Sequence, residues 1–191
     1  YIDIPWLNNF FYNDELVINK ALRFKPDLIC FSAITNLYMP IKKLARKFKQ
    51  LMPKVPIICG GIHPTSLPEE TIEEDCFDMI CLGEGEGAME DLLQRMREKK
   101  SYNDIKNLWV KDTTGHIHKN EKRPVIRPLE SLPNPDKSFF AKYGALTSRI
   151  MIMTTRGCPF ACTFCVNSFR NQEYSGEIYL RQRSVDHVIE E

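Results

Sequence analysis

Residues 55–61 read VPIICGG. This short apolar run has the length of a buried strand, and the glycine pair that ends it lets another backbone or a ligand approach closely. The pattern recurs on both sides of this stretch. An apolar run at 28–32 is followed by small and polar residues, and another at 78–82 is followed by Gly-Glu-Gly-Glu at 83–86. The three runs predict three buried strands with small or polar turns at their carboxyl ends.

Amphipathic helices are predicted between these strands. Apolar residues follow the helical period at 14–24 and again at 40–51, where Pro40 occupies a favoured first-turn position. A helix near 68–74 and another that begins after Gly85 continue the alternation. Apolar strands that alternate with amphipathic helices predict an α/β fold with a parallel sheet covered on both faces.

Ligands of open parallel sheets bind outside the carboxyl ends of the strands. In this chain those ends carry residues 32–35 (Ser-Ala-Ile-Thr), 60–65 (Gly-Gly-Ile-His-Pro-Thr) and 83–86. Glycine after a strand is ordinary turn chemistry, so each group alone is weak evidence. Because parallel strands end at the same edge of a sheet, the three groups together predict a ligand site at that edge.

The sequence changes character after residue 100. Residues 108–111 and 116–119 flank Asp-Thr-Thr-Gly and predict a β-hairpin. Four prolines between 124 and 135 predict a stiff, extended connector. A strand is then predicted over 149–155, and a short amphipathic helix after Ser184.

Three closely spaced cysteines follow the last predicted strand. Cys158, Cys162 and Cys165 have the spacing C-x3-C-x2-C on a loop that begins at Gly157. A 4Fe–4S cluster normally takes four thiolates, so three would leave one iron open to a substrate or cofactor. Zinc and inert thiols are the alternatives, although a structural zinc site usually adds a second cysteine pair or histidines.

Three of the other cysteines are expected to be structural, and no function is assigned to Cys76. Cys30, Cys59 and Cys81 lie in apolar runs, where free cysteine packs as a small hydrophobic residue. Disulfides are not expected, because the seven cysteines are odd in number and no signal peptide is visible. A cytoplasmic location is expected on the same grounds.

The stretch 154–165 (TTRGCPFACTFC) resembles the radical S-adenosylmethionine superfamily. The resemblance implies that Cys158, Cys162 and Cys165 hold a 4Fe–4S cluster whose open iron binds S-adenosylmethionine. It places Phe164 beside the adenine of that cofactor. It also implies reductive cleavage of S-adenosylmethionine to a 5′-deoxyadenosyl radical, with the electron supplied by a reductase such as flavodoxin or ferredoxin.

Residues 25–35, 55–70 and 77–93 resemble the cobalamin-binding domain that precedes many radical S-adenosylmethionine domains. The resemblance implies a flavodoxin-like, Rossmann-like α/β fold with the nucleotide tail of cobalamin along the strand ends. The residues implied in cobalamin binding are Ser32 and Thr35, which would line the tail pocket, and Gly60, Gly61, Gly83, Glu84 and Gly85, which would pack against the tail or the corrin edge. No D-x-H-x-x-G segment occurs, so His63 is interpreted as a hydrogen-bonding loop residue and not as a cobalt ligand.

Three segments are expected from these resemblances. Residues 1–100 are the cobalamin-binding-like α/β domain, which is incomplete at its N-terminus because the first strand and helix are missing. Residues 101–145 are the β-hairpin and proline-rich connector. Residues 146–191 are the start of a radical S-adenosylmethionine domain, with the first βα unit of a partial TIM-type barrel. A complete barrel takes about 250 residues, so the chain is expected to be a fragment across a domain junction, inactive by itself.

The implied function is that of a cobalamin-dependent radical S-adenosylmethionine enzyme, most commonly a methyltransferase that acts on an unactivated carbon. Its substrate would be a small molecule, natural product or lipid. Some relatives in this class close rings or carry out rearrangements without net methyl transfer. The alternatives are a radical enzyme whose front domain is a recognition module without cobalamin, and a non-enzymatic iron–sulfur or zinc protein. A net charge of +1 gives no indication of nucleic acid, and no apolar run reaches the ~20 residues of a membrane span.

Overall fold

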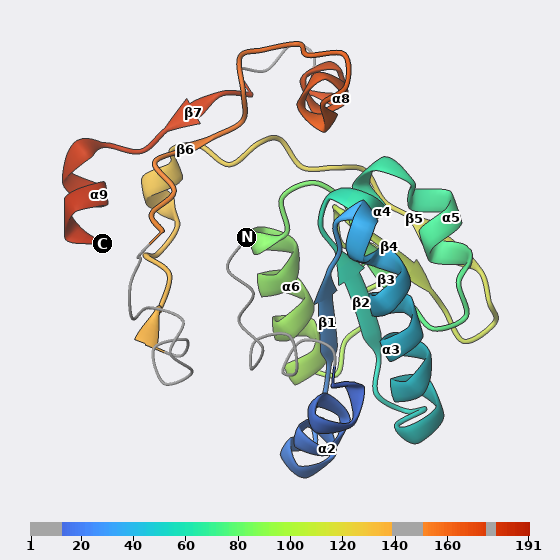
Figure 1. The fold of residues 1–191 in the computed structure, drawn as a ribbon. Helices are drawn as coiled ribbons and strands as arrows, with labels where there is room; N and C mark the ends of the chain where they lie inside the picture. Colours follow the sequence, from blue (N-terminus) through green and yellow to red (C-terminus); the bar gives the residue numbers. More distant parts are fainter. Residues whose placement is uncertain (1–12, 139–150, 175–178) are drawn as a thin grey trace. The chain divides into compact units, whose positions relative to one another are not determined.

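The computed structural model describes residues 13–138, 151–174 and 179–191. The chain divides into two compact units, residues 1–123 and 124–191 (Figure 1). The first unit carries the predicted strand ends, and the second carries the three-cysteine loop. The expected segment boundary at residue 145 lies outside the described residues. Residues 149 and 150, the first two of the last predicted strand, lie outside them as well.

Five strands form one sheet in the described part of the first unit, in the order β1-β2-β3-β4-β5. β1 (Ile29–Ser32), β2 (Ile57–Gly60) and β3 (Met79–Cys81) are parallel. β4 (Leu108–Lys111) pairs with β3 in the antiparallel sense, and β5 (Ile117–Lys119) does the same with β4. The predicted parallel α/β arrangement is confirmed for β1–β3, and the predicted hairpin extends the same sheet with two antiparallel strands.

The helices of the first unit follow the predicted alternation with the strands. They are α2 (Asp14–Phe24), the 3₁₀ turn η1 (Thr35–Leu37), α3 (Tyr38–Leu51), α4 (Ile62–Ser66), α5 (Pro68–Glu73) and α6 (Glu86–Arg97). Asn13 caps α2 by accepting a hydrogen bond from the backbone N–H of Leu16 at 3.1 Å. The sequence pattern did not predict α4, because five residues are too few to show helical periodicity. Among the described residues, every helix is too short or too polar to cross a bilayer.

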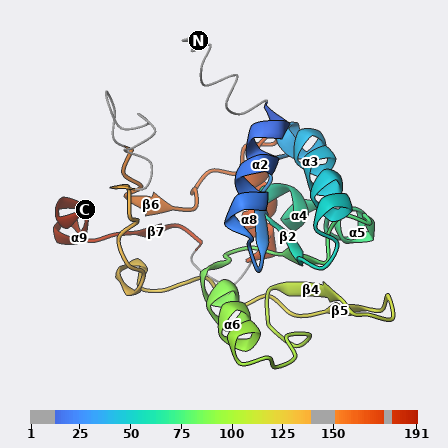
Figure 2. The same cartoon turned by 90° about the horizontal axis from the view of Figure 1, so that it is seen from below.

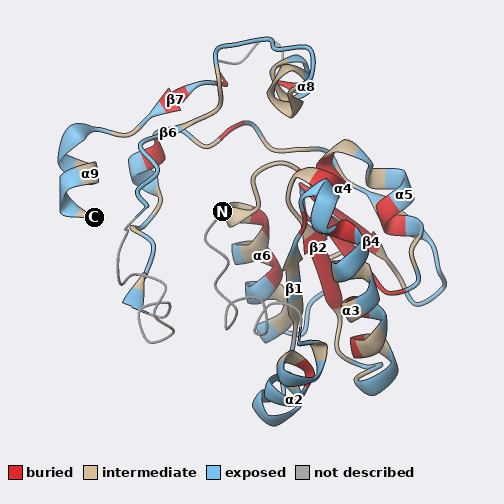
Figure 3. Cartoon of the chain, in the orientation of Figure 1, coloured by how far each residue is buried: buried red, intermediate tan, exposed pale blue. Residues whose placement is uncertain are grey.

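Helices cover both faces of the sheet (Figure 2). Successive residues of a strand point to opposite faces, so Ile57 and Cys59 pack with α3 and α5 while Ile58 packs with α6. The buried residues gather on the sheet and on the inward sides of these helices (Figure 3). This three-layer packing leaves the carboxyl ends of β1, β2 and β3 together at one edge.

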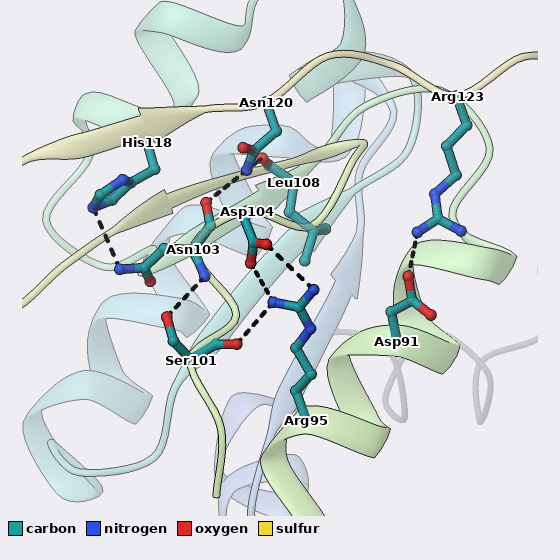
Figure 4. Close-up of polar contacts among 9 residues, drawn as sticks. All are labelled: Asp91, Arg95, Ser101, Asn103, Asp104, Leu108, His118, Asn120 and Arg123. Carbon is teal, nitrogen blue, oxygen red and sulfur yellow. Dashed lines mark hydrogen bonds and ion pairs between the residues drawn. The ribbon is translucent and has the colours of Figure 1, made fainter. Parts of the chain in front are cut away.

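Polar contacts attach the hairpin to the segment that follows α6 (Figure 4). Arg95 on α6 forms an ion pair with Asp104 and donates to the backbone carbonyl of Ser101 at 2.9 Å. The side-chain amide of Asn120 donates to the backbone carbonyl of Asn103 at 2.9 Å. These contacts hold the 101–107 segment between the helix and the hairpin.

The second unit contains shorter elements. Its 3₁₀ turn η2 (Leu129–Ser131) precedes a two-stranded antiparallel ribbon of β6 (Thr155–Arg156) and β7 (Arg181–Gln182), and its helices are α8 (Val166–Glu173) and α9 (Val185–Glu190). The predicted helix after Ser184 is confirmed, with the Ser184 side chain as its cap. The strand predicted over 149–155 is limited to β6 in the described residues, because only Thr155 and Arg156 have a partner strand.

Asn107 connects the turn after β3 to the hairpin. Its side chain is buried, and its amide donates to the carbonyl oxygens of Leu82 at 2.6 Å and Glu84 at 3.1 Å. Its side-chain oxygen accepts a hydrogen bond from the backbone N–H of Arg123 at 2.8 Å. The backbone of Asn107 has a φ of 73°, a left-handed conformation that asparagine tolerates better than most residues. Asparagine is therefore matched to this position by its backbone and by its side chain.

Asn107→Asp is expected to lower the free energy of unfolding by about 2–4 kcal/mol, because the buried Leu82 carbonyl and the partly buried Glu84 carbonyl lose their donor and face a carboxylate. Urea unfolding followed by circular dichroism measures the change. Asn19→Asp is the matched control: Asn19 is exposed on α2, so the same chemical change there should cost less than about 0.5 kcal/mol. Equal stability of the two variants would contradict the role of Asn107 as a buried link.

Candidate functional site

The turns after β1 and β2 are joined by backbone hydrogen bonds. The N–H of Ala33 donates to the carbonyl oxygen of Gly60 at 2.8 Å, and the N–H of His63 donates to the carbonyl oxygen of Ala33 at 3.0 Å. These bonds continue the pairing of β1 with β2 beyond the ends of both strands. The predicted residues Ser32 and Gly60 therefore lie at the same edge of the sheet, as expected.

Thr65 connects these two turns to the turn after β3. Its hydroxyl donates to the carbonyl oxygen of Gly61 at 2.7 Å and accepts from the backbone N–H of Gly83 at 3.0 Å. Thr65 is buried, so this bridge is shielded from water. Thr65 was not among the site residues predicted from the sequence. Its position in the glycine-rich segment after β2 is the signal that could have suggested a role.

Gly61 is required by the fold itself. Its φ is +98°, and a Cβ at this position would lie 2.7 Å from the carbonyl oxygen and 2.9 Å from the nitrogen of Ala33. A Cβ at Gly60 would meet the Cβ of Cys81 at 3.5 Å, an ordinary contact. Only Gly61 of this pair is explained by close packing of the turns, and the contact of either glycine with a ligand stays a prediction.

The turn after β3 leads directly into α6. Gly83 has a φ of 70°, which favours glycine, and Gly85 is the residue immediately before the helix. The carbonyl oxygen of Glu84 is held by Asn107 at 3.1 Å. The structure therefore fixes all three predicted positions of this turn next to the turns that follow β1 and β2.

Two hydroxyl-bearing residues are exposed at the same edge. Ser32 ends β1 and Thr35 begins η1, and both are exposed. The hydroxyl of Thr35 is 3.3 Å from Nδ1 of His63, which confirms the hydrogen-bonding role predicted for this histidine. The side chains of Ser32 and Thr35 give the edge a polar surface that is accessible to solvent.

His63 is a buried imidazole behind this surface. It is 5% exposed and stacks on the ring of Tyr38 with 3.7 Å between ring centroids. Burial lowers the pKa of His63, which keeps the ring neutral at physiological pH. Its Nε2 is buried and has no hydrogen-bond partner among the described residues. An unpaired buried nitrogen costs about 1–3 kcal/mol, so a polar ligand group or a water molecule at this position would stabilise the site.

The seven cysteines all lie in the described part of the chain, and none forms a disulfide. Burial raises the pKa of the Cys59 and Cys81 thiols to about 12, so both stay protonated and unreactive in the core, as predicted. The prediction of a core position is wrong for Cys30, which is exposed. β1 alternates between partly buried and exposed residues, and Cys30 is on its exposed side.

The first residue of the three-cysteine loop, Gly157, packs against the backbone that leads into β7. Gly157 has a φ of +90°, and a Cβ there would collide with the carbonyl oxygen of Tyr179. At the other end of the loop, Cys165 is the N-terminal cap residue of α8. The loop therefore runs from a glycine that packs against the backbone of residues 179–180 to the start of α8.

The thiols of the loop are accessible but not gathered. Cys162 is exposed, and Cys158 and Cys165 are half-buried. No three His, Cys, Asp or Glu side chains converge into a metal-binding group anywhere in the described residues. Phe164, predicted beside adenine, is 92% exposed and does not fill the core. Three free thiols on one loop match the donor set of an iron–sulfur cluster, and binding would have to bring them together.

Comparison with known proteins finds a family match for the first unit and similar proteins over most of the chain. Residues 2–93 match the B12 binding domain family. An uncharacterized methyltransferase of Pyrococcus horikoshii is 31% identical over 173 residues, which are 88% of this chain and 36% of that protein. The anaerobic magnesium-protoporphyrin IX monomethyl ester cyclase of Rubrivivax gelatinosus is 26% identical over 162 residues, 80% of this chain and 29% of the cyclase.

A solved structure has the same fold. The cobalamin-dependent S-adenosylmethionine radical enzyme OxsB, with aqua-cobalamin and S-adenosylmethionine bound, superposes with a TM-score of 0.66 at 21% identity, over 80% of this chain and 21% of its own. This chain spans 36% or less of the length of each of these proteins. The match of 88% of the chain to the archaeal methyltransferase extends beyond the B12 binding domain. Residues 2–93 are thus identified as a B12 binding domain, and the chain as a whole is similar to a methyltransferase and has the fold of a cobalamin-dependent S-adenosylmethionine radical enzyme.

Proposed function

We propose that the chain supplies the corrinoid site and the cluster loop of a cobalamin-dependent radical S-adenosylmethionine methyltransferase that acts on an unactivated carbon. The observation that carries this proposal is the presence, in one chain, of a polar strand-end edge and a loop of three free cysteines. The name of the archaeal relative, a methyltransferase, supports the reaction class.

The strand-end edge fits the polar nucleotide tail of a corrinoid. The hydroxyls of Ser32 and Thr35 are exposed and can exchange hydrogen bonds with amide and phosphate groups. The glycines of the turns at 60–61 and 83–85 carry no side chain and would let a ligand approach the backbone closely. His63 adds a buried nitrogen that still requires a partner. These residues would bind and orient the corrinoid.

The cysteine loop fits a 4Fe–4S cluster through the chemistry of its donors. Cys158, Cys162 and Cys165 would bind as thiolates, so uptake of the metal would release protons and order the loop. Phe164, exposed beside Cys165, would be free to pack on the adenine of S-adenosylmethionine. When both cofactors are bound, they supply one-electron reduction of S-adenosylmethionine and methyl transfer, while the protein orients them and excludes competing reactions.

A ring-forming reaction is the second candidate, supported by the similarity to the magnesium-protoporphyrin ester cyclase. The substrate in either case is proposed to be a small molecule, natural product or lipid, and the electron donor a reductase such as flavodoxin or ferredoxin. A methylated product formed together with S-adenosylhomocysteine would favour methyl transfer. A cyclised product without an added methyl group would favour ring formation.

Cys162→Ala in the full-length protein is expected to remove most of the iron and sulfide and to reduce 5′-deoxyadenosine formation below detection, because two thiolates cannot hold the cluster. Corrinoid binding should remain. Cys30→Ala is the matched control, since Cys30 is an exposed cysteine on β1, and it should retain cluster and cleavage. Iron analysis and chromatography of the nucleoside product provide the readouts. Cleavage by Cys162→Ala at the wild-type rate would contradict the cluster assignment.

Ser32→Leu is expected to weaken corrinoid binding by at least about tenfold, which corresponds to 1.4 kcal/mol, while the iron content stays unchanged. A bulky residue at Gly61 is less informative, because its side chain would collide with Ala33 and distort the fold. Cys30→Leu is the control, because Cys30 is on the same exposed side of β1, two residues before the strand end. Absorbance titration with hydroxocobalamin measures both affinities. Equal affinities would rule out the strand-end edge as the corrinoid site.

A further inference from the structure

The backbone carbonyl of each cysteine in the loop accepts a hydrogen bond. The carbonyl of Cys162 accepts from the backbone N–H of Cys165 at 3.0 Å, and that of Cys165 accepts from the Ser168 hydroxyl at 2.7 Å. Both of these bonds are local. The carbonyl of Cys158 accepts from the side-chain amide of Asn171 at 3.1 Å, across 13 residues of sequence.

Asn171 lies on α8, after all three cysteines, and reaches back over the loop. Its amide nitrogen is within 3.4 Å of the Phe160 carbonyl as well as 3.1 Å of the Cys158 carbonyl. An amide group has two N–H donors, so it can serve both acceptors at once. This side-chain contact attaches the first half of the loop to α8.

The consequence is that both ends of the motif depend on one helix. Cys165 is the residue immediately before α8, and Cys158 is held to the last turn of α8 through Asn171. Cys162 lies exposed between the two anchors. Ordering a residue costs about 1–2 kcal/mol of backbone entropy, so a loop whose ends are already held loses less freedom when its thiols close on a metal.

We infer that Asn171 is a positioning residue for the cluster: it holds the Cys158–Phe160 backbone on α8 so that the three thiols can close on one metal centre. This inference rests on the proposed function, because Asn171 would position the same cysteines that hold the proposed cluster. Asn171 acts through the backbone and touches no reacting atom.

The test compares Asn171→Asp with Gln172→Glu in the full-length protein. Both replace an amide by a carboxylate on α8, but Gln172 is exposed and its side chain forms no hydrogen bond to the loop among the described residues. After anaerobic reconstitution, iron release to a chelator is expected to be at least about tenfold faster from Asn171→Asp, the usual scale for the loss of an outer contact at a metal site. Gln172→Glu should match the wild type.

The electron paramagnetic resonance signal gives a second readout that fold stability alone would not change. The shift that S-adenosylmethionine induces in the reduced wild-type cluster is expected to be altered in Asn171→Asp and retained in Gln172→Glu. Equal iron release and equal signals in both variants would overturn the inference while leaving the proposed function intact. Failure of the wild type to take up iron would overturn the proposed function and the inference with it.

Hydrogen exchange in the metal-free protein covers the case in which Asn171→Asp takes up no iron. Faster amide exchange confined to residues 157–165 would support the inference, because it would show that the loop has lost its anchor. Faster exchange throughout the second unit would overturn it, because the substitution would then have disrupted the fold.

Discussion

The close approach of the backbone at Gly61 to Ala33 is the constraint on which the strand-end edge depends. A Cβ at position 61 would be 2.7 Å from the Ala33 carbonyl oxygen, so glycine allows the turn after β2 to lie against the turn after β1. That approach brings the His63 N–H to 3.0 Å from the same carbonyl and its ring beside Thr35. Two turns that would otherwise be separate loops therefore form one platform, and a ligand that binds there meets a surface that is already ordered.

The two cofactor sites of the proposal are built in different ways. At the strand ends, the buried side chains of Thr65 and Asn107 attach the third turn, so the whole edge is held by hydrogen bonds within the fold. In the cysteine loop, the backbone is held but the thiols do not yet converge. This difference is consistent with the chemistry, because a metal site commonly completes its order only when the metal binds.

Local patterns predict much of this structure. α2 has its predicted bounds, because its apolar spacing and the helix-breaking Lys25-Pro26 pair indicate the same end of the helix. The strand-end residues lie together because parallel strands share an edge. The exposure of Cys30 was not predicted, because an apolar run does not specify what covers each side of a strand. Asn107 and Asn171 were also missed: their partners lie 25 and 13 residues away, and such long-range contacts produce no periodic signal.

In the proposed function, one chain holds an iron–sulfur cluster and a corrinoid at separate sites. The most direct measurement is the content of iron, sulfide, zinc and corrinoid per chain in full-length protein prepared anaerobically with cobalamin. We predict about four iron and four sulfide per chain, together with stoichiometric corrinoid and no zinc. Zinc without iron would contradict the cluster, and a full iron content without corrinoid would contradict the proposed function of the strand-end edge.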